Sequence, residues 1–246
     1  MEGYDERSYG RGMADVYDDW YPGISDVDGT VERIVELAGP GSRVLELGVG
    51  TGRLALPLAQ RGLDVHGVDT SPEMLDRLRA KAGAERVAVI EGDMAALEPP
   101  GPFALVFVAY NTLFNLTSAA AQQACFESVA ARLVPGGRFV VEAFVPDERA
   151  SGSYVEVREL TADRVVLGVS RADHPNQRAE GQFVELVDGT PVRLRPWAIR
   201  WATPEELDTM AAGAGLSLEH RWSGWRGESF DADSAHHVSV WKLTHA

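Results

Sequence analysis

The sequence has little cysteine, no long apolar run and few basic residues for its size. Among its 246 residues Cys125 is the single cysteine, which excludes a disulfide framework and a metal site built on several cysteines. No apolar run approaches the ~18 residues of a membrane-spanning helix. The first 25 residues lack the basic start and apolar core of a signal peptide. We therefore expect a cytoplasmic protein without membrane contact.

Acidic residues outnumber basic ones. The chain has 23 Lys and Arg against 37 Asp and Glu, a formal net charge of -14 at pH 7. Such a chain repels a phosphate backbone unless its basic residues gather on one face, and the sequence has no such cluster. The six histidines show no metal-ligand spacing completed by a third ligand. We expect a small-molecule substrate, no nucleic acid and no metal.

Short β-branched runs alternate with amphipathic stretches from residue 25 to 145. This rhythm is typical of βαβ units, which build a parallel sheet covered by helices on both faces. Strands are predicted over 42–48, 63–69, 86–93, 103–110 and 137–144, and helices over 53–62, 71–82 and 118–133. Ser71 suits a helix N-cap, with Pro72 at the first helical position.

A different pattern follows residue 146. Polar and apolar residues alternate over 153–160, 163–173, 181–189 and 190–201, with turn signals between them, which predicts antiparallel hairpins. Thr203 and Glu206 form the pattern of a capping box at the start of a last helix. Two strands, 216–222 and 236–243, then close the chain.

The amino-terminal segment is rich in aromatic rings: Tyr4, Tyr9, Tyr17, Tyr21 and Trp20 all precede residue 22. It is either a helix packed on the sheet edge or a lid over a ligand. We divide the chain into a lid segment (1–24), a ligand-binding core (25–145), an antiparallel insertion (146–202) and a final helix and strands that complete the core (203–246). The insertion either covers the substrate or pairs two copies, so a monomer and a homodimer both stay open.

Three glycines, Gly48, Gly50 and Gly52, follow the first predicted strand. In open α/β sheets, ligands bind beyond the carboxyl ends of the strands. A dinucleotide fingerprint has its third glycine one residue later, where this chain has Arg53. Glu46, two residues before the turn, would repel a pyrophosphate and suits an ammonium group. A nicotinamide-dependent oxidoreductase is therefore disfavoured.

Two further carboxylates end neighbouring strands. Asp69 ends the second strand and has two acceptor oxygens for the hydroxyls of a ribose. Asp93 ends the third strand, where it can accept a hydrogen bond from the exocyclic amine of adenine. Together with Glu46, these residues describe a ligand that has an ammonium, a ribose and an adenine but no phosphate.

Four ordered motifs, VLELGVGTGR (44–53), GVDTSPEML (67–75), EGDM (91–94) and LVPGGRFVVE (133–142), resemble those of class I S-adenosylmethionine-dependent methyltransferases. The resemblance covers residues 15–145 and, more loosely, the last helix and strands. It implies an α/β, Rossmann-like, doubly wound sheet of seven strands in the order 3-2-1-4-5-7-6 with the last strand antiparallel. The antiparallel insertion precedes the last helix. It also implies S-adenosylmethionine as cofactor and S-adenosylhomocysteine as product.

The resemblance also implies roles for individual residues. Glu46 and the turn of Gly48, Gly50 and Gly52 match residues that hold the methionine moiety; Asp69 holds the ribose; Thr70, Met74, Asp93 and Met94 surround the adenine. Tyr17, Arg53 and Tyr110 are further candidates for cofactor binding. Tyr17 and Tyr21 match amino-terminal tyrosines that reach the cofactor or the transferring methyl. Substrate contacts begin at Tyr110 and Asn111 in the family.

Three further residues are candidates near the acceptor. Glu142, late in the fifth strand, is a candidate base or a partner for a substrate cation. His236 and His237 open the last strand; we select His237 as the second candidate base. Arg200, just before the last helix, is the preferred contact for a substrate carboxylate or phosphate, because arginine offers bidentate recognition.

The predicted function is methyl transfer from S-adenosylmethionine to an O or N atom of a small molecule (EC 2.1.1.-). Residues 14–22 and the insertion resemble enzymes that methylate sugar amines and other natural-product intermediates. Residues 109–116, AYNTLFNL, lack the Asn/Asp-Pro-Pro-aromatic signature of nucleic-acid amino methyltransferases. The alternative is a protein that binds the cofactor without methyl transfer, as a non-methylating enzyme or in an assembly.

Overall fold

The computed structural model describes residues 1–21, 23, 25–98, 100–147 and 152–244. Its helices are α1 (Ser8–Met13), α2 (Tyr17–Trp20), α3 (Val27–Ala38), α4 (Ala55–Gln60), α5 (Pro72–Arg79), α6 (Ala119–Ala130) and α7 (Pro204–Gly213). Its strands are β1 (Arg43–Leu47), β2 (Asp64–Asp69), β3 (Val87–Glu91), β4 (Phe103–Val108), β5 (Leu133–Phe144), β6 (Gly152–Leu160), β7 (Arg164–Asp173), β8 (Arg178–Val187), β9 (Arg193–Arg200), β10 (Leu216–Trp222) and β11 (His236–Leu243). Three short 3-10 helices are η1 (Ala84–Arg86), η2 (Thr112–Asn115) and η3 (His174–Asn176).

The main sheet has seven strands in the order β10-β11-β5-β4-β1-β2-β3. Strands β1 to β5 run parallel, and β11 is antiparallel to β5. With β11 as the seventh strand and β10 as the sixth, this is the predicted order 3-2-1-4-5-7-6, which is confirmed. All five parallel strands therefore end at one edge, where the candidate ligand residues were expected.

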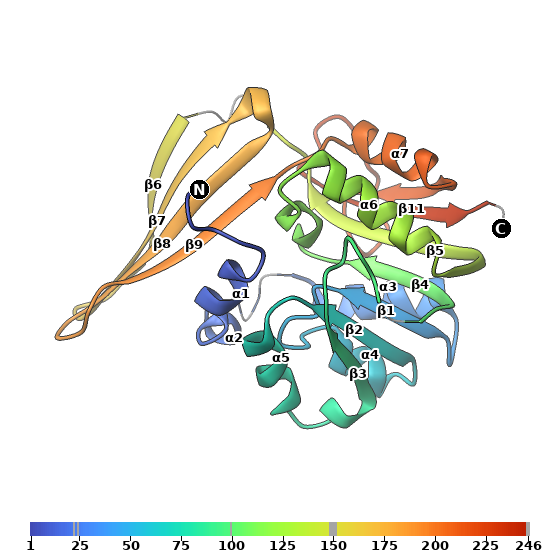
Figure 1. The fold of residues 1–246 in the computed structure, drawn as a ribbon, viewed down its shortest axis with the longest axis horizontal. Helices are drawn as coiled ribbons and strands as arrows, with labels where there is room; N and C mark the ends of the chain where they lie inside the picture. The colour runs from blue at the N-terminus through green and yellow to red at the C-terminus, as the bar shows by residue number, and fades with distance from the viewer. Residues whose placement is uncertain (22, 24, 99, 148–151, 245–246) are drawn as a thin grey trace.

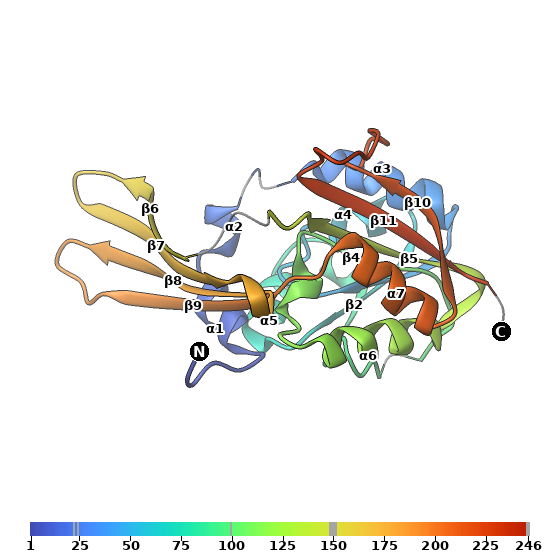
Figure 2. The same ribbon diagram turned by 90° about the horizontal axis from the view of Figure 1, so that it is seen from above.

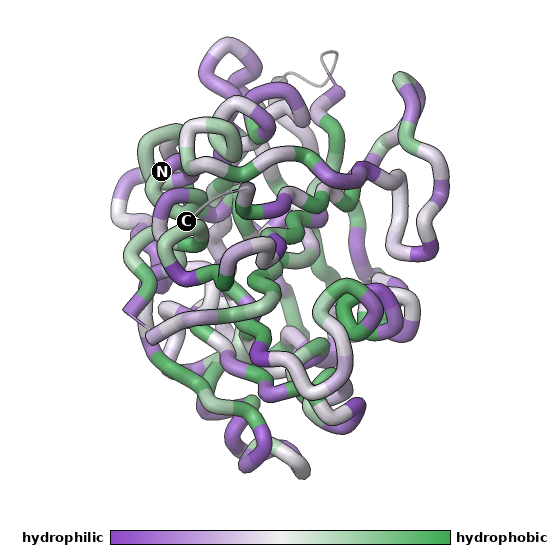
Figure 3. The backbone as a smooth tube through the Cα atoms, turned by 90° about the vertical axis from the view of Figure 1, so that its right-hand side faces the viewer, coloured by the Kyte–Doolittle hydropathy of each residue, from purple (hydrophilic) through white to green (hydrophobic). Residues whose placement is uncertain are grey.

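Each face of this sheet carries its own apolar core. One core packs α3, α4 and α5 against side chains such as Val44 and Phe107; the other packs α6 and α7 against Leu45 and Val106. Neighbouring residues of a buried strand point to opposite faces, so one apolar run supplies both cores. Figure 3 shows the apolar segments, in green, mainly along the strands inside the molecule.

Element boundaries follow local chemistry. The Ser71 side chain accepts the N–H of Met74, and Thr203 and Glu206 form the predicted capping box. The predicted fourth strand is too long: β4 stops at Val108, because Tyr110 and Asn111 adopt left-handed backbone with φ of 49° and 62°. Non-glycine residues seldom adopt this conformation, and it concentrates at functional loops.

The predicted insertion forms a separate antiparallel sheet, β6-β7-β8-β9. It projects from one end of the main sheet, with α1 and α2 at its base (Figures 1 and 2). Arg195 of β9 joins this sheet to the amino-terminal segment: its guanidinium pairs with Asp15, which follows α1, and with Glu185 of β8 at 2.7 Å. Arg193 shares the strand face of Arg195, as its spacing predicts, and also pairs with Asp15.

Candidate functional site

Two glycines of the turn after β1 line a cavity, and the third allows a helix to pack closely. Gly48 and Gly50 have φ of +69° and +53°, in the left-handed region that glycine tolerates, and both line a cavity. A Cβ at Gly48 would overlap the side chain of Thr112. At Gly52 a Cβ would lie 2.8 Å from Leu78 of α5, so this glycine permits helix packing, and it lines neither of the cavities that contain Gly48.

Asp69 fixes the turn from the end of β2. Its Oδ2 accepts the N–H of Gly50 at 2.9 Å, and its Oδ1 accepts the N–H of Ser71 at 2.9 Å. Burial raises the pKa of Asp69, and the N–H groups of Ser71 and Gly50 oppose that rise. Each carboxylate oxygen has a second lone-pair site, which is available to a ligand in the cavity.

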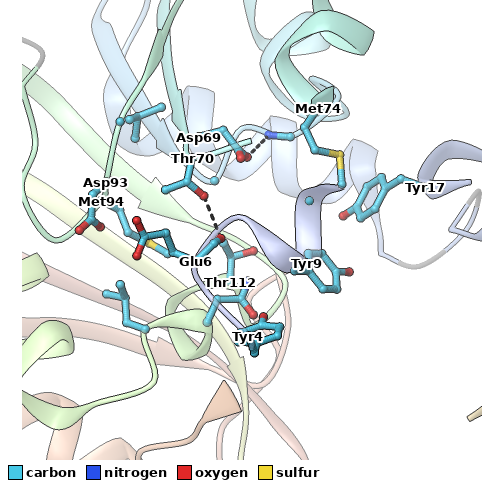
Figure 4. A pocket seen from close by; sticks show the side chains of 17 residues that line it. Tyr4, Glu6, Tyr9, Tyr17, Asp69, Thr70, Met74, Asp93, Met94 and Thr112 are labelled. Carbon is cyan, nitrogen blue, oxygen red and sulfur yellow. Dashed lines mark hydrogen bonds between the residues drawn. The ribbon is translucent and has the colours of Figure 1, made fainter. Parts of the chain in front are cut away.

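A cavity of about 100 Å³ lies between the sheet edge and the amino-terminal segment. Figure 4 shows its two walls: Tyr4, Glu6, Tyr9 and Tyr17 come from the amino-terminal segment, and Asp69, Thr70, Met74, Asp93 and Met94 from the core. The Thr70 hydroxyl donates to the Glu6 carbonyl at 3.1 Å and joins the walls. The predicted ribose and adenine residues thus lie around one cavity, and the predicted lid segment covers it.

Glu46 has no partner for one of its oxygens. Its side chain is buried at 5% exposure, and Oε2 accepts no hydrogen bond in the described chain. Burial raises its pKa to about 8; Arg53 opposes this rise and Asp69 adds to it. A buried carboxylate without a partner is costly, and an ammonium group at this position would satisfy it. This orphaned oxygen fits the amino-acid end of the predicted cofactor.

A second, smaller cavity lies beside Glu46. Arg53 lines it together with Tyr17, Glu46, Gly48 and Tyr110. Its Nη1 donates to Ser25, whereas its buried Nε has no partner among the described residues. A carboxylate and a guanidinium at one turn can bind the ammonium and the carboxylate of an amino acid. Tyr17, Gly48, Gly50 and Thr112 line both cavities.

The loop after β4 is tied to the end of β5. The Tyr110 N–H donates to Glu142 Oε2 at 2.8 Å, the Asn111 N–H donates to the Glu142 carbonyl at 3.0 Å, and Asn111 Oδ1 accepts the Phe144 N–H at 2.7 Å. These bonds hold the left-handed residues in place. Tyr110, Asn111 and Glu142 then line a third cavity of about 250 Å³.

This third cavity is acidic. Its lining is Asp26, Tyr110, Asn111, Glu142, Ser223, Gly224, Trp225, Glu228 and His236. Asp26 is neutralised by Arg226 at 2.6 Å, whereas Glu142 has no ion pair among the described residues. Tyr110 lines both this cavity and the one that contains Glu46, so the two are neighbours across its ring.

The two predicted tyrosines lie together. The ring centroids of Tyr17 and Tyr21 are 5.1 Å apart. Burial raises the pKa of Tyr17 to about 12, with Arg53 opposing the rise, so its phenol stays protonated at neutral pH. Tyr17 lines both cavities on the cofactor side, and Tyr21 lies behind it, next to Arg158 of β6.

Two predicted residues lie elsewhere. Arg200 is buried, and its Nη atoms donate to Gln122 at 2.6 Å and Gln177 at 2.7 Å; it lines none of the three cavities, and its guanidinium is committed to packing. His237 faces α7, with Nδ1 2.9 Å from Ser239 Oγ, and burial lowers its pKa to about 3. Because strand neighbours alternate, the structure brings His236 to the third cavity in place of His237.

The sequence motifs gave no sign of several lining residues. Thr112 and Asn115 belong to η2, whose position depends on the turn before it. Tyr4 and Tyr9 had a signal, the density of rings near the amino terminus, although neither was selected as a site residue. Arg158, which lies beside Tyr21 and lines none of the three cavities, had no signal, since a lone arginine on a polar strand is ordinary.

In the described ranges no group of three His, Cys, Asp or Glu side chains is arranged to hold a metal ion. No helix of that part of the chain has the length and apolarity to cross a membrane.

Comparison with known proteins is consistent with this site. Residues 44–137 match a family model described as a methyltransferase domain. Cypemycin N-terminal methyltransferase from Streptomyces sp. is 33% identical over 198 residues, 79% of this chain and 80% of the relative. A demethylmenaquinone methyltransferase from Thermus thermophilus is 33% identical over 183 residues, 72% and 76% of the two chains.

A solved structure is similar along nearly the whole chain. The CcbJ methyltransferase from Streptomyces caelestis has a TM-score of 0.89 and 39% identity, covering 98% of this chain and 99% of the other. The motifs, the strand order and these likenesses agree with one another. The chain belongs to the class I S-adenosylmethionine-dependent methyltransferases.

Proposed function

We propose that this protein transfers the methyl group of S-adenosylmethionine to a nucleophilic O or N atom of a small cytoplasmic molecule, and that an amine nitrogen is the acceptor. The observation that carries the proposal is the unpartnered Glu46 carboxylate in the second, smaller cavity. This cavity shares Tyr17 and Gly48 with the cavity around Asp69, and it shares Tyr110 with the acidic cavity. This arrangement suits an amino-acid nucleoside on one side of Tyr110 and a cationic acceptor on the other.

The residues that would hold the cofactor follow from its chemical groups. Glu46 would bind the ammonium and Arg53 the carboxylate of the methionine part. Asp69 would accept from the ribose hydroxyls, and Asp93 from the adenine amine. The bound sulfonium supplies a methyl group that is already activated for displacement.

The acceptor would enter the acidic cavity. A protonated amine is attracted by Glu142, whose second oxygen is available, and it must lose its proton before it attacks. Glu142 and His236 both line this cavity and are the proposed proton acceptors. The name of the cypemycin relative, an N-terminal methyltransferase, supports an amine.

Positioning would supply most of the rate. Holding the nucleophile in line with the methyl group can contribute about 7 to 11 kcal/mol through effective molarity. The Tyr110-Asn111 loop, anchored to β5 by three hydrogen bonds, and the rings of Tyr17 and Tyr21 would shape that approach and exclude water.

The test combines binding with transfer. Calorimetric titration is expected to show binding of S-adenosylhomocysteine and none of NAD. Incubation with methyl-labelled cofactor and a panel of small amines and alcohols is expected to label amines. Binding of NAD in place of S-adenosylhomocysteine would refute the site assignment. Retained cofactor binding with no labelled product across the panel would favour the non-methylating alternative.

A further inference from the structure

Arg158, on the inner face of edge strand β6, stands at the end of a row of aromatic rings. Its Cζ lies 4.6 Å from the Phe183 ring centroid and 5.6 Å from that of Tyr21. Tyr21 is 5.1 Å from Tyr17, which lines both cofactor-side cavities. The guanidinium is therefore next to the lid tyrosines, and it lines none of the three cavities itself.

The charge of Arg158 is not neutralised. On the same sheet, Arg164 pairs with Glu159 and Glu185, and Arg193 and Arg195 pair with Asp15. Arg158 has no carboxylate oxygen within 4.0 Å in the described ranges of the chain. In a chain with net charge -14, a free cation beside the site gives an anionic ligand a local partner against the overall repulsion.

The position of the Arg158 guanidinium over these rings leaves its N–H groups available to a carboxylate. A guanidinium over an aromatic ring uses its face, and its N–H groups point outward in the plane. Two parallel N–H groups match the two oxygens of a carboxylate in a bidentate pair. The rings of Phe183 and Tyr21 hold this fork in a fixed orientation, which lowers the entropic cost of binding.

The charges of Arg158 and Glu142 both affect the pKa of the Tyr110 hydroxyl. Burial is the main cause of the raised pKa of Tyr110; the positive charge of Arg158 opposes that rise and the negative charge of Glu142 adds to it. The acceptor region thus has a cation toward the β6 side and an anion toward the β5 side.

We propose that Arg158 binds a carboxylate group of the methyl acceptor, so that the acceptor is an amine that also carries a carboxylate. This inference rests on the proposed methyl transfer and adds a substrate class to it. Arg158 replaces Arg200 as the arginine that selects the substrate.

The experiment compares matched probes in the presence of saturating S-adenosylhomocysteine. Glycine, β-alanine, γ-aminobutyrate and para-aminomethylbenzoate, each with its carboxamide, vary the separation between amine and carboxylate. Binding is measured by calorimetry and saturation-transfer NMR to the wild type, Arg158→Met and Arg158→Lys. Arg171→Met, an exposed arginine of β7 paired with Glu180, is the matched control.

We expect at least one acid to bind about tenfold or more tightly than its amide, since a bidentate hydrogen bond between two charged groups is stronger than one to a neutral amide. Arg158→Met should abolish this preference, Arg158→Lys should keep part of it, and Arg171→Met should keep all of it. Equal binding of every acid and its amide, failure of every acid to bind, or a preference that survives Arg158→Met would each overturn the proposal. Thermal melting checks that the variants fold.

Failure of this inference is separable from failure of the proposed function. If S-adenosylhomocysteine binds and amides are methylated as well as acids, methyl transfer stands and the role of Arg158 falls. If S-adenosylhomocysteine itself does not bind the wild type, the proposed function falls first.

Discussion

Asp69 accepts the N–H of Gly50 at 2.9 Å, so the carboxylate predicted to bind the ribose also holds the turn that is predicted to receive the methionine part. Asp69→Ala is expected to weaken S-adenosylhomocysteine binding at least about tenfold, because it strands ribose hydroxyls and the half-buried Gly50 N–H. The affinity of Asp69→Asn should lie between those of the wild type and Asp69→Ala. Calorimetry provides the affinities. Asp76→Ala, an exposed carboxylate of α5 paired with Arg79, is the control; unchanged affinity in Asp69→Ala would remove this residue from the site.

Cofactor binding should depend on pH through Glu46. In the free protein its pKa is raised to about 8 by burial, so at about pH 7 the carboxyl is mostly protonated. An ammonium ligand favours the charged form, so binding releases a proton and the affinity rises up to about tenfold per pH unit until the pH passes 8. Calorimetry in two buffers of different ionisation enthalpy measures the release. Glu46→Gln should bind more weakly and without this proton release; a wild type that releases no proton contradicts the assignment.

Tyr17→Phe should lower turnover more than it lowers cofactor affinity. The ring still packs against Tyr21, while the hydroxyl that reaches the cofactor cavities is lost. Because the pKa of Tyr17 is about 12, no ionisation of this phenol should appear in a rate profile near neutral pH. Steady-state rates and calorimetry on the same preparation separate the two effects, and an unchanged rate would return Tyr17 to a packing role.

We expect Asn111 to stabilise the fold, because its backbone is left-handed and its side chain bonds to the Phe144 N–H. Asn111→Ala is expected to lower the free energy of unfolding by about 2 kcal/mol, from the left-handed φ of 62° and the lost bond to the Phe144 N–H. Asn111→Gly keeps the backbone free and should lose only about half of that. Urea unfolding measures both. Asn176→Ala, an exposed asparagine bonded to Asp173, should change stability by less than about 0.5 kcal/mol; equal losses in all three variants would contradict this account.

Arg195 should control the attachment of the amino-terminal segment. Arg195→Met removes a 4%-exposed guanidinium from Asp15 and Glu185 and should cost about 3 kcal/mol, because the buried carboxylate of Glu185 loses a partner. Amide exchange over residues 8–20 is expected to accelerate. Arg171→Met, which breaks an exposed pair with Glu180, should cost less than about 1 kcal/mol. Exchange that is unaffected in Arg195→Met would show that other contacts hold the segment.

The sequence predicted the features that depend on local sequence patterns. Glu46, Asp69 and Asp93 are fixed by the ends of buried strands, and all of them face one sheet edge because parallel strands end together. The seven-strand order was implied by the resemblance to class I methyltransferases that the motifs carry. The structure bears out Ser71 and Thr203 as caps, whose chemistry is complete within four residues.

What the sequence missed depends on distant partners. His236 and His237 differ by one step in a strand, and their faces are set by pairing with β5. Arg200 looked available because Gln122 and Gln177, its partners, lie 78 and 23 residues away. The left-handed turn at Tyr110 and Asn111 depends on hydrogen bonds to β5. None of these contacts can be recognised from the neighbouring residues in the sequence.

The separation of the two sheets has an evolutionary consequence. In the described chain the β6-β7-β8-β9 sheet shares no strand with the seven-stranded sheet, and the buried guanidinium of Arg195 ties it to Asp15 of the amino-terminal segment. Mutations of its other side chains can therefore accumulate without disturbing the glycine turn or the strand ends that are proposed to hold the cofactor. An exchange of this sheet between relatives is a direct route to a new acceptor range on an unchanged methyl-donating core.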